Sequence, residues 1–144
     1  MIECFWELFS WCAGLVDASN LALPATTLDW GCYRSMFVGC TSLIAPPSLP
    51  ATTLVGECYN GMFSGCISLS VSPELPATTF APDCYSFMFY DTNTLPDTSR
   101  INFSDTTHTT SGAMSGLFAG TKVTYQDLQN ILPKDSYNRP CLPV

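Results

Sequence analysis

The sequence predicts an α/β repeat fold: a solenoid of about four to five rungs, with short strands on one face and short helices on the other. One unit of the chain occurs twice with nearly the same sequence, in residues 32–54 and again in residues 58–80. Its block is Cys-Tyr-x-x-Met-Phe-x-Gly-Cys-x-Ser-Leu, and Leu-Pro-Ala-Thr-Thr follows. The equivalent residues Cys32 and Cys58 are 26 positions apart. A unit this short cannot bury its apolar face alone, so consecutive units are expected to stack.

The third unit in chain order, which begins at residue 58, shows which elements each unit is predicted to form. Residues 58–63 place apolar side chains at i, i+1, i+4 and i+5, which predicts one stripe of a short helix. Gly65 offers the left-handed conformation that ends such a helix. Residues 68–72 are predicted as the short strand. Pro76 then fixes a bend, and a threonine of residues 78–79 can cap the next helix.

Two further units flank this regular pair. Residues 4–15 form a disguised copy of the block, with an offset of 28 residues to the next block, so an inserted pair is expected within residues 16–21. Cys84 begins a fourth block at the regular spacing, in which Thr92 replaces the second cysteine.

The pattern decays after residue 95. Residues 101–107 are a degenerate copy of the Leu-Pro-Ala-Thr-Thr segment, and residues 113–121 are a degenerate fifth block. The spacing of apolar residues predicts a short helix over residues 124–132, ended by Pro133. We therefore expect a single domain over residues 1–144, with regular repeats at 4–95 and a degenerate repeat plus a C-terminal cap at 96–144.

Composition excludes several classes of partner. Charged residues make up 12% of the chain and the net charge is −7, while the five Lys and Arg residues are scattered, so we expect no nucleic-acid binding. The sequence contains no run of 18 apolar residues, so we expect no membrane insertion. Acidic residues near Met1, without Lys or Arg, argue against a signal peptide in this chain. The start inside a repeat suggests a piece of a longer array.

The repeated block resembles the leucine-rich repeats of BspA-like bacterial surface proteins. The resemblance depends on Cys-Tyr, Met-Phe-x-Gly-Cys-x-Ser-Leu and Leu-Pro-Ala-Thr-Thr-Leu; it covers residues 4–95 well and residues 101–121 poorly. It implies a right-handed leucine-rich-repeat solenoid with a short parallel sheet. It also implies a location at the cell surface or outside the cell, and a role in adhesion or protein binding.

Cysteines are the most conspicuous residue type, at positions Cys4, Cys12, Cys32, Cys40, Cys58, Cys66, Cys84 and Cys141. Structural zinc sites space paired ligands more closely than the seven intervening residues seen here, so we expect no metal. Equivalent cysteines of neighbouring units, and pairs within a predicted helix, would both be about 10 Å apart, too far for a disulfide. Cross-pairing of non-equivalent cysteines stays open, and we predict free thiols that serve as small buried residues.

No group of residues suggests catalysis or a cofactor. His108, the single histidine, lies in a polar Ser/Thr-rich stretch and is interpreted as a solvated loop residue. Tyr33, Tyr59 and Tyr85 recur with the repeat, either to pack the core or to form an aromatic row on a binding face. We predict that the protein is not an enzyme.

The functional prediction is a non-enzymatic binding or adhesion module of a bacterial cell-surface or secreted protein, presenting a solenoid surface to a protein or glycan ligand. The alternative is a structural subunit or tip module of a larger assembly, such as a fibre or phage appendage. In that case partner chains, or a second copy, would contact the apolar N-terminal rung. The predicted contact edge consists of Phe5, Trp6, Phe9 and Trp11.

Overall fold

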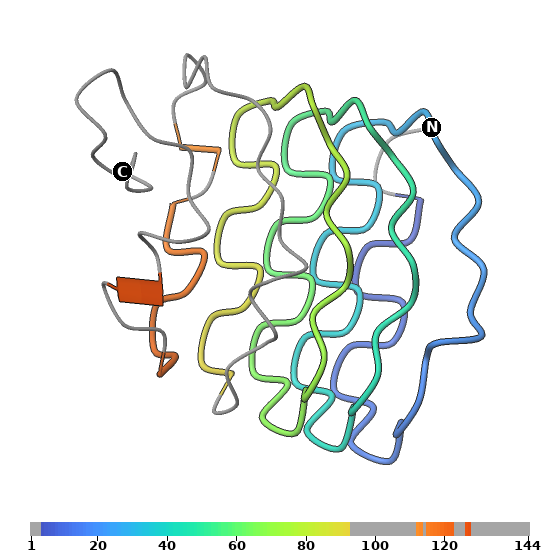
Figure 1. Ribbon diagram of the computed structural model, residues 1–144. Coiled ribbons are helices and arrows are strands. Elements are labelled where there is room, and N and C mark those ends of the chain that lie inside the picture. The colour runs from blue at the N-terminus through green and yellow to red at the C-terminus, as the bar shows by residue number, and fades with distance from the viewer. Residues whose placement is uncertain (1–3, 93–111, 114, 123–125, 128–144) are drawn as a thin grey trace.

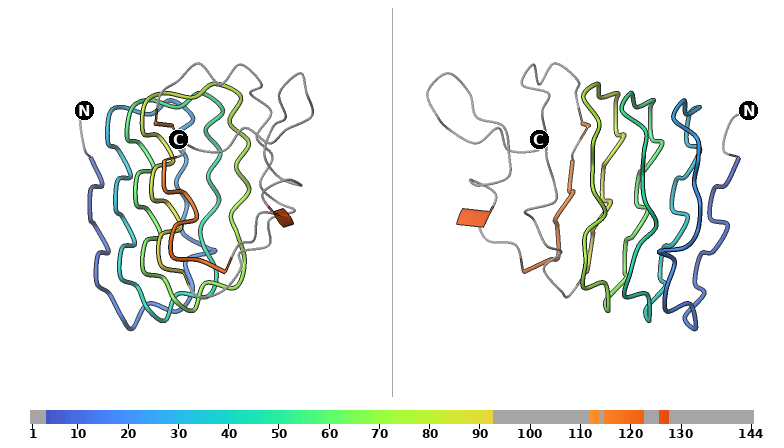
Figure 2. Two further views of the ribbon diagram at one scale, coloured as in Figure 1. Left: turned by 90° about the vertical axis from the view of Figure 1, so that its left-hand side faces the viewer. Right: turned by 45° about the vertical axis from the view of Figure 1, so that its right-hand side comes forward.

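The computed structural model describes residues 4–92, 112–113, 115–122 and 126–127. Along these residues the chain coils into a stack of rungs (Figure 1). Each rung is one block and the connection that follows it. Blocks begin at Cys4, Cys32, Cys58 and Cys84, and the C-terminal block comprises the described residues between 112 and 121. Figure 2 shows the rungs side by side in chain order, with the first block at one end and the C-terminal block at the other.

The α/β fold class predicted from the sequence is wrong. The short helices expected in the blocks do not form, and neither does the strand expected at residues 68–72. The leucine-rich-repeat architecture implied by the resemblance, with strands on one face and helices on the other, is therefore overturned too. Within the described residues, helical structure is limited to residues 126–127, and the β-contacts are isolated parallel bridges: Asp17 with Ala45, Thr27 with Thr53, and Thr53 with Thr79.

The blocks are ladders of tight turns. The N–H of Tyr33 donates to the carbonyl of Cys58 in the next rung (2.9 Å), and the N–H of Phe37 donates to that of Met62 (3.0 Å). Between them, the N–H of Met36 closes a turn on the carbonyl of Tyr33, three residues back in its own rung (3.3 Å). An α-helix would send every N–H four residues back within its own segment. Here alternate N–H groups join neighbouring rungs instead, which produces the meandering path of each block in Figure 1.

Backbone dihedrals explain why these segments are not helices. Every fourth residue of a block has a positive φ, as at Gly31 (62°), Ser35 (52°) and Gly39 (70°). Such a residue suits the third position of a tight turn and is excluded from a right-handed helix. The apolar pattern i, i+1, i+4, i+5 fits a four-residue turn repeat as well as a 3.6-residue helix. Gly61 (62°), which lies inside the predicted helix 58–63, is one of these turn positions.

The connections differ from the blocks. Ser70 donates to the carbonyl of Ile44 (3.2 Å), but no backbone hydrogen bond joins residues 45–51 to residues 71–77. Pairing resumes at the bridge of Thr53 with Thr79. The predicted helix-capping role of residues 78–79 is therefore wrong, because these threonines contact the preceding rung and no helix follows.

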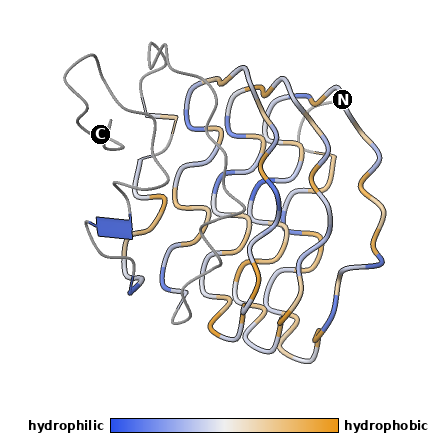
Figure 3. Ribbon diagram, in the orientation of Figure 1, coloured by the Kyte–Doolittle hydropathy of each residue, from blue (hydrophilic) through white to orange (hydrophobic). Residues whose placement is uncertain are grey.

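The core consists of columns of identical side chains. The rings of Tyr33 and Tyr59 stack at 5.9 Å, as do those of Tyr59 and Tyr85. All three tyrosines are about 1% exposed, so the core-packing alternative is confirmed and the aromatic row on a binding face is wrong. Hydrophobic segments recur along each rung (Figure 3). A second column consists of stacked phenylalanines, from Phe9 to Phe89. It continues into the degenerate fifth block, whose Phe118 stacks on Phe89 at 5.9 Å.

Several predictions fall outside the described residues. These are the degenerate segment 101–107, the loop containing His108, residue Cys141 and most of the predicted helix 124–132. Within the described part, no helix is long and apolar enough to cross a membrane.

Candidate binding surfaces

The buried thiols are poor candidates for chemistry. None of the seven described cysteines forms a disulfide, as the sequence predicts, although Cys12 is exposed and Cys4 only half-buried. Burial raises the pKa of Cys58 and of Cys66 to about 12, and that of Cys84 to about 11. These thiols stay protonated at neutral pH, and the thiolate is the nucleophilic form. In the described ranges no cluster of three or more His, Cys, Asp or Glu side chains could hold a metal ion.

The first block forms the N-terminal end of the stack, and its aromatic residues separate into two groups. Phe5 stacks on Tyr33 and Phe9 stacks on Phe37, both at 5.5 Å, so these two rings lie on the end of the stack itself. Trp6 lies 5.8 Å from the guanidinium of Arg34 in the next rung. Trp11 folds over Gly39. The two tryptophans therefore belong to the outer wall.

The N-terminal end is apolar and open. Phe5 is 41% exposed and the neighbouring Leu8 is 54% exposed. A pocket of about 210 Å³ opens here between the block and the connection, lined by Phe5, Leu8, Phe9, Tyr33, Met36 and residues 21–25. The prediction that partner chains contact Phe5, Trp6, Phe9 and Trp11 stays a prediction. The sequence did not identify Leu8, whose side chain completes this surface.

A row of backbone acceptors runs along the same end. In every later block, carbonyls at alternate positions accept N–H groups from the rung before, as Met36 accepts from Phe9 (2.9 Å). The equivalent carbonyls of the first block belong to Trp6, Leu8 and Ser10, and within the described chain they accept no hydrogen bond. The N-terminal end thus has the polar character of an unpaired sheet edge.

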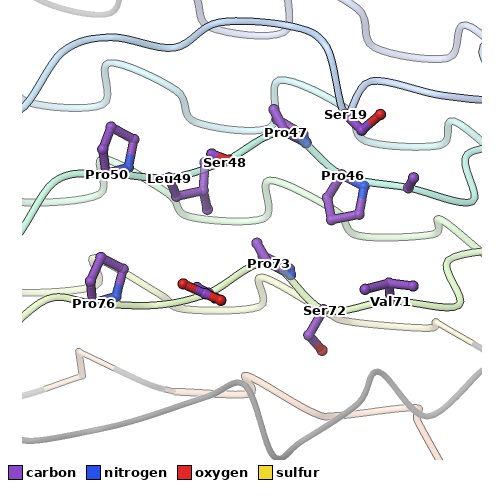
Figure 4. Close-up of a pocket in the computed structure, with 12 residues that line it drawn as sticks. Ser19, Pro46, Pro47, Ser48, Leu49, Pro50, Val71, Ser72, Pro73 and Pro76 are labelled. Atoms are coloured by element: carbon purple, nitrogen blue, oxygen red, sulfur yellow. The ribbon is translucent and has the colours of Figure 1, made fainter.

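A second surface is a groove between two neighbouring connections (Figure 4). It has a volume of about 560 Å³ and lies between residues 45–50 and residues 71–76, with Ser19 at its margin. Five prolines line it: Pro46, Pro47, Pro50, Pro73 and Pro76. In Figure 4 the two proline-rich segments run side by side, with Pro50 opposite Pro76 and Pro47 opposite Pro73.

Prolines explain why the stack is open at this groove. A proline has no N–H and a fixed φ, so it cannot take part in the pairing that closes the blocks. Ser48 and Leu49 keep N–H groups that donate to no acceptor in the described chain. The hydroxyl of Ser72 is buried without a hydrogen-bond partner, which is uncommon in folded proteins. The sequence signal for this groove was the recurrence of prolines in both units, of which only Pro76 was interpreted, as a bend.

The groove can bind by shape and hydrogen bonding rather than by charge. Prolyl rings offer flat apolar faces, while free backbone groups and serine hydroxyls offer donors and acceptors. Among the described residues that line the groove, Glu74 is the one that is ionisable. Such a surface suits an extended peptide or a neutral glycan.

A shallower hollow of about 370 Å³ lies on the outer face of the blocks, beside the exposed rings of Phe87 and Tyr90. These rings meet edge to face at 6.0 Å. Asn60 and Ser64 supply polar groups nearby. Because the blocks beneath it are fully hydrogen-bonded to each other, this hollow offers side chains but few backbone groups.

No known protein family, curated protein or solved structure matches this chain.

Proposed function

We propose that this protein is a non-enzymatic binding module that holds a protein or glycan partner in the groove between residues 45–50 and residues 71–76. The observation that supports the proposal most directly is the absence of backbone pairing between these two connections. In the described blocks, by contrast, neighbouring rungs are joined by short hydrogen bonds. A ligand that lies in the groove would supply the missing partners.

The groove is well suited to bind without changing shape. Its prolines have a single preferred φ, so the two segments lose little conformational freedom when a ligand docks. The rungs on which they lie are held rigidly by the block ladders. Peptide backbones and sugar hydroxyls both pair with free N–H and C=O groups, as in strand addition to an open sheet edge.

Charge narrows the range of partners. The chain has a net charge of −7, and the described lining of the groove contains Glu74 but no Lys or Arg. Nucleic acids and strongly anionic glycans are therefore disfavoured by repulsion. Neutral glycans and neutral or basic peptide segments fit best.

The setting that we propose is the bacterial cell surface or the extracellular medium, and its support is the resemblance of the repeated block to BspA-like repeats. The protonated state of the buried thiols supports a role without catalysis. Adhesion is consistent with a surface location and with a role without catalysis, because a rigid stack of rungs offers a wide surface for contact.

Binding assays on groove variants test this proposal. The purified chain is screened against an array of neutral glycans and an array of extended peptides, and the strongest ligand is then titrated. Ser48→Trp fills the groove at an exposed position and should weaken binding at least about tenfold. Thr52→Trp, further along the same connection and also exposed, is the matched control and should bind normally. Equal affinity for the two variants would place the ligand elsewhere and overturn the proposal.

A further inference from the structure

Equivalent cysteines of neighbouring rungs lie close to one another. The N–H of Phe5 donates to the carbonyl of Cys32 in the next rung (2.9 Å), and the rings of Phe5 and Tyr33 stack at 5.5 Å, so Cys4 lies beside Cys32. Chains that pair through their backbones run about 4.8 Å apart, and a disulfide needs Cα atoms separated by about 4.4 to 6.8 Å. The separation of about 10 Å expected from the sequence is therefore wrong, because it assumed a helix in each rung.

The side chains of Cys4 and Cys32 are in contact. Burial raises the pKa of Cys32, and so does the hydrogen bond that its thiol donates to the sulfur of Cys4. At the other end of the block the arrangement differs, because the thiol of Cys40 donates to the backbone carbonyl of Phe9 (3.0 Å). The pair of Cys4 and Cys32 is thus already arranged sulfur to sulfur.

This pair also differs from the interior cysteines in its access to solvent. Cys58 and Cys84 are 0% exposed, so an oxidant in solution does not reach them while the stack is folded. Cys4 is half-buried in the first block, where no described rung covers its outer side. Reactive thiols need such partial exposure. Contact between two thiols and access from solvent therefore coincide at the N-terminal end of the described stack.

We propose that Cys4 and Cys32 are a disulfide-forming site, which closes in an oxidising medium and fastens the first rung to the second. The inference goes beyond the groove proposed above and does not depend on it. In the structure the pair is reduced. A small-molecule disulfide such as oxidised glutathione is a sufficient oxidant.

The reaction is a thiol–disulfide exchange in two stages. The thiolate of Cys4 attacks one sulfur of oxidised glutathione, which breaks the glutathione S–S bond, forms a mixed disulfide on Cys4 and releases one glutathione. The thiolate of Cys32 then attacks the sulfur of Cys4, forms the protein disulfide and releases the second glutathione. The two cysteines lose two electrons and two protons, and both leave with the two glutathione molecules as their thiols.

A bridge at this position would hold the end of the stack. The N–H groups of Phe5, Glu7 and Phe9 join the first block to the second, and no described rung supports the first block from its other side. A terminal rung with one neighbour opens more readily than an interior rung. A covalent link between residues 4 and 32 removes conformations that the detached rung would otherwise gain.

Peptide mapping by mass spectrometry tests the pairing. The reduced full chain is incubated with oxidised glutathione, the remaining thiols are blocked by alkylation, and disulfide-linked peptides are identified. We expect a monomer in which one peptide pair is joined through Cys4 and Cys32. Cys12, which is exposed, should stop at the mixed disulfide with glutathione. If Cys4 carries glutathione without a bridge, or is bridged to a cysteine other than Cys32, the proposal is wrong.

Amide hydrogen exchange tests whether the bridge fastens the rung. Oxidation should slow exchange of the N–H of Phe9, which donates to Met36 (2.9 Å), by at least about tenfold. Cys4→Ser should abolish both the bridge and this slowing. Cys12→Ser, in the same block, is the matched control and should keep both. Unchanged exchange of Phe9 in a chain that carries the bridge would overturn the proposal.

Discussion

Blocks and connections alternate along the chain, yet they satisfy their backbones in opposite ways. In the blocks, alternate N–H groups bond to the next rung and the others close turns, so neighbouring rungs are tightly joined. In the connections, prolines remove donors, and residues 45–51 face residues 71–77 without a backbone hydrogen bond. Rigidity and binding capacity are thus divided between two sides of one rung. The blocks supply rigidity because their backbones pair, and the connections leave backbone groups free because prolines interrupt the pairing.

The largest expected effect comes from the block core. Phe63 is fully buried between the rings of Phe37 and Phe89, at 5.6 and 5.9 Å. Phe63→Ala should reduce the free energy of unfolding by about 3 to 5 kcal/mol, because it leaves a cavity in the column. Phe87→Ala, at a 45% exposed site, should cost less than about 1 kcal/mol. Urea denaturation measures both, and similar losses would contradict the assignment of Phe63 to the core.

The turn positions of the blocks should come next. Gly39 has φ +70°, and a Cβ there would collide with the indole of Trp11. Gly39→Ala should therefore cost about 2 to 4 kcal/mol, from the left-handed conformation and from overpacking. Gly14 has open space around it, so Gly14→Ala should change stability by less than about 1 kcal/mol. In the background of Trp11→Ala, the cost of Gly39→Ala should shrink, and an unchanged cost would remove the steric part of this explanation.

Two buried hydroxyls should respond with opposite signs. Thr92 donates to the carbonyl of Phe89 (3.0 Å) at the end of a block, so Thr92→Val should destabilise by about 1 kcal/mol. Ser72 is buried beside the groove without a partner, so Ser72→Ala should be neutral or stabilising by up to about 1 kcal/mol. Thermal and chemical denaturation would both reveal the signs. A loss of stability in Ser72→Ala would mean that its hydroxyl is bonded within the fold.

The last effect concerns pH. Burial raises the pKa of Cys58 and Cys66 from an ordinary value of 9.0 to about 12 in the folded state. Above pH 9 the unfolded chain loses these protons first, so it binds fewer protons than the folded chain and stability falls as pH rises. In reducing buffer, the urea midpoint should decrease between about pH 8 and about pH 10.5. Cys58→Ala should flatten this dependence, and an unchanged slope would contradict the role given to this thiol.

Sequence and structure agree on register and differ on local conformation. The spacing of Cys32 and Cys58 predicts which residues lie above one another, and the stacked tyrosines confirm that register. The helices were mispredicted because apolar residues at i, i+1, i+4 and i+5 suit a four-residue turn ladder equally well. Gly61 in the middle of the predicted helix was the available contrary signal, since glycine disfavours helix interiors.

The candidate surfaces were predicted unevenly. Phe5 and Phe9 do lie at the N-terminal end of the described stack, where no described rung covers their outer faces. Trp6 and Trp11 were placed there as well, but they fold outward over the next rung. The groove was not predicted, because the prolines that mark it in the sequence do not reveal which backbone groups lack partners in three dimensions.

Amide hydrogen exchange of individual residues tests the central contrast most directly. Leu49 and Phe63 both have buried side chains, but the N–H of Phe63 donates to Met88 (2.9 Å), whereas that of Leu49 donates to no acceptor in the described chain. Under native conditions, Phe63 should exchange only through large-scale unfolding, while Leu49 should exchange faster by at least about a hundredfold, as expected for an unbonded amide. Equal protection of the two amides would show that the connections are paired like the blocks, and would contradict this account.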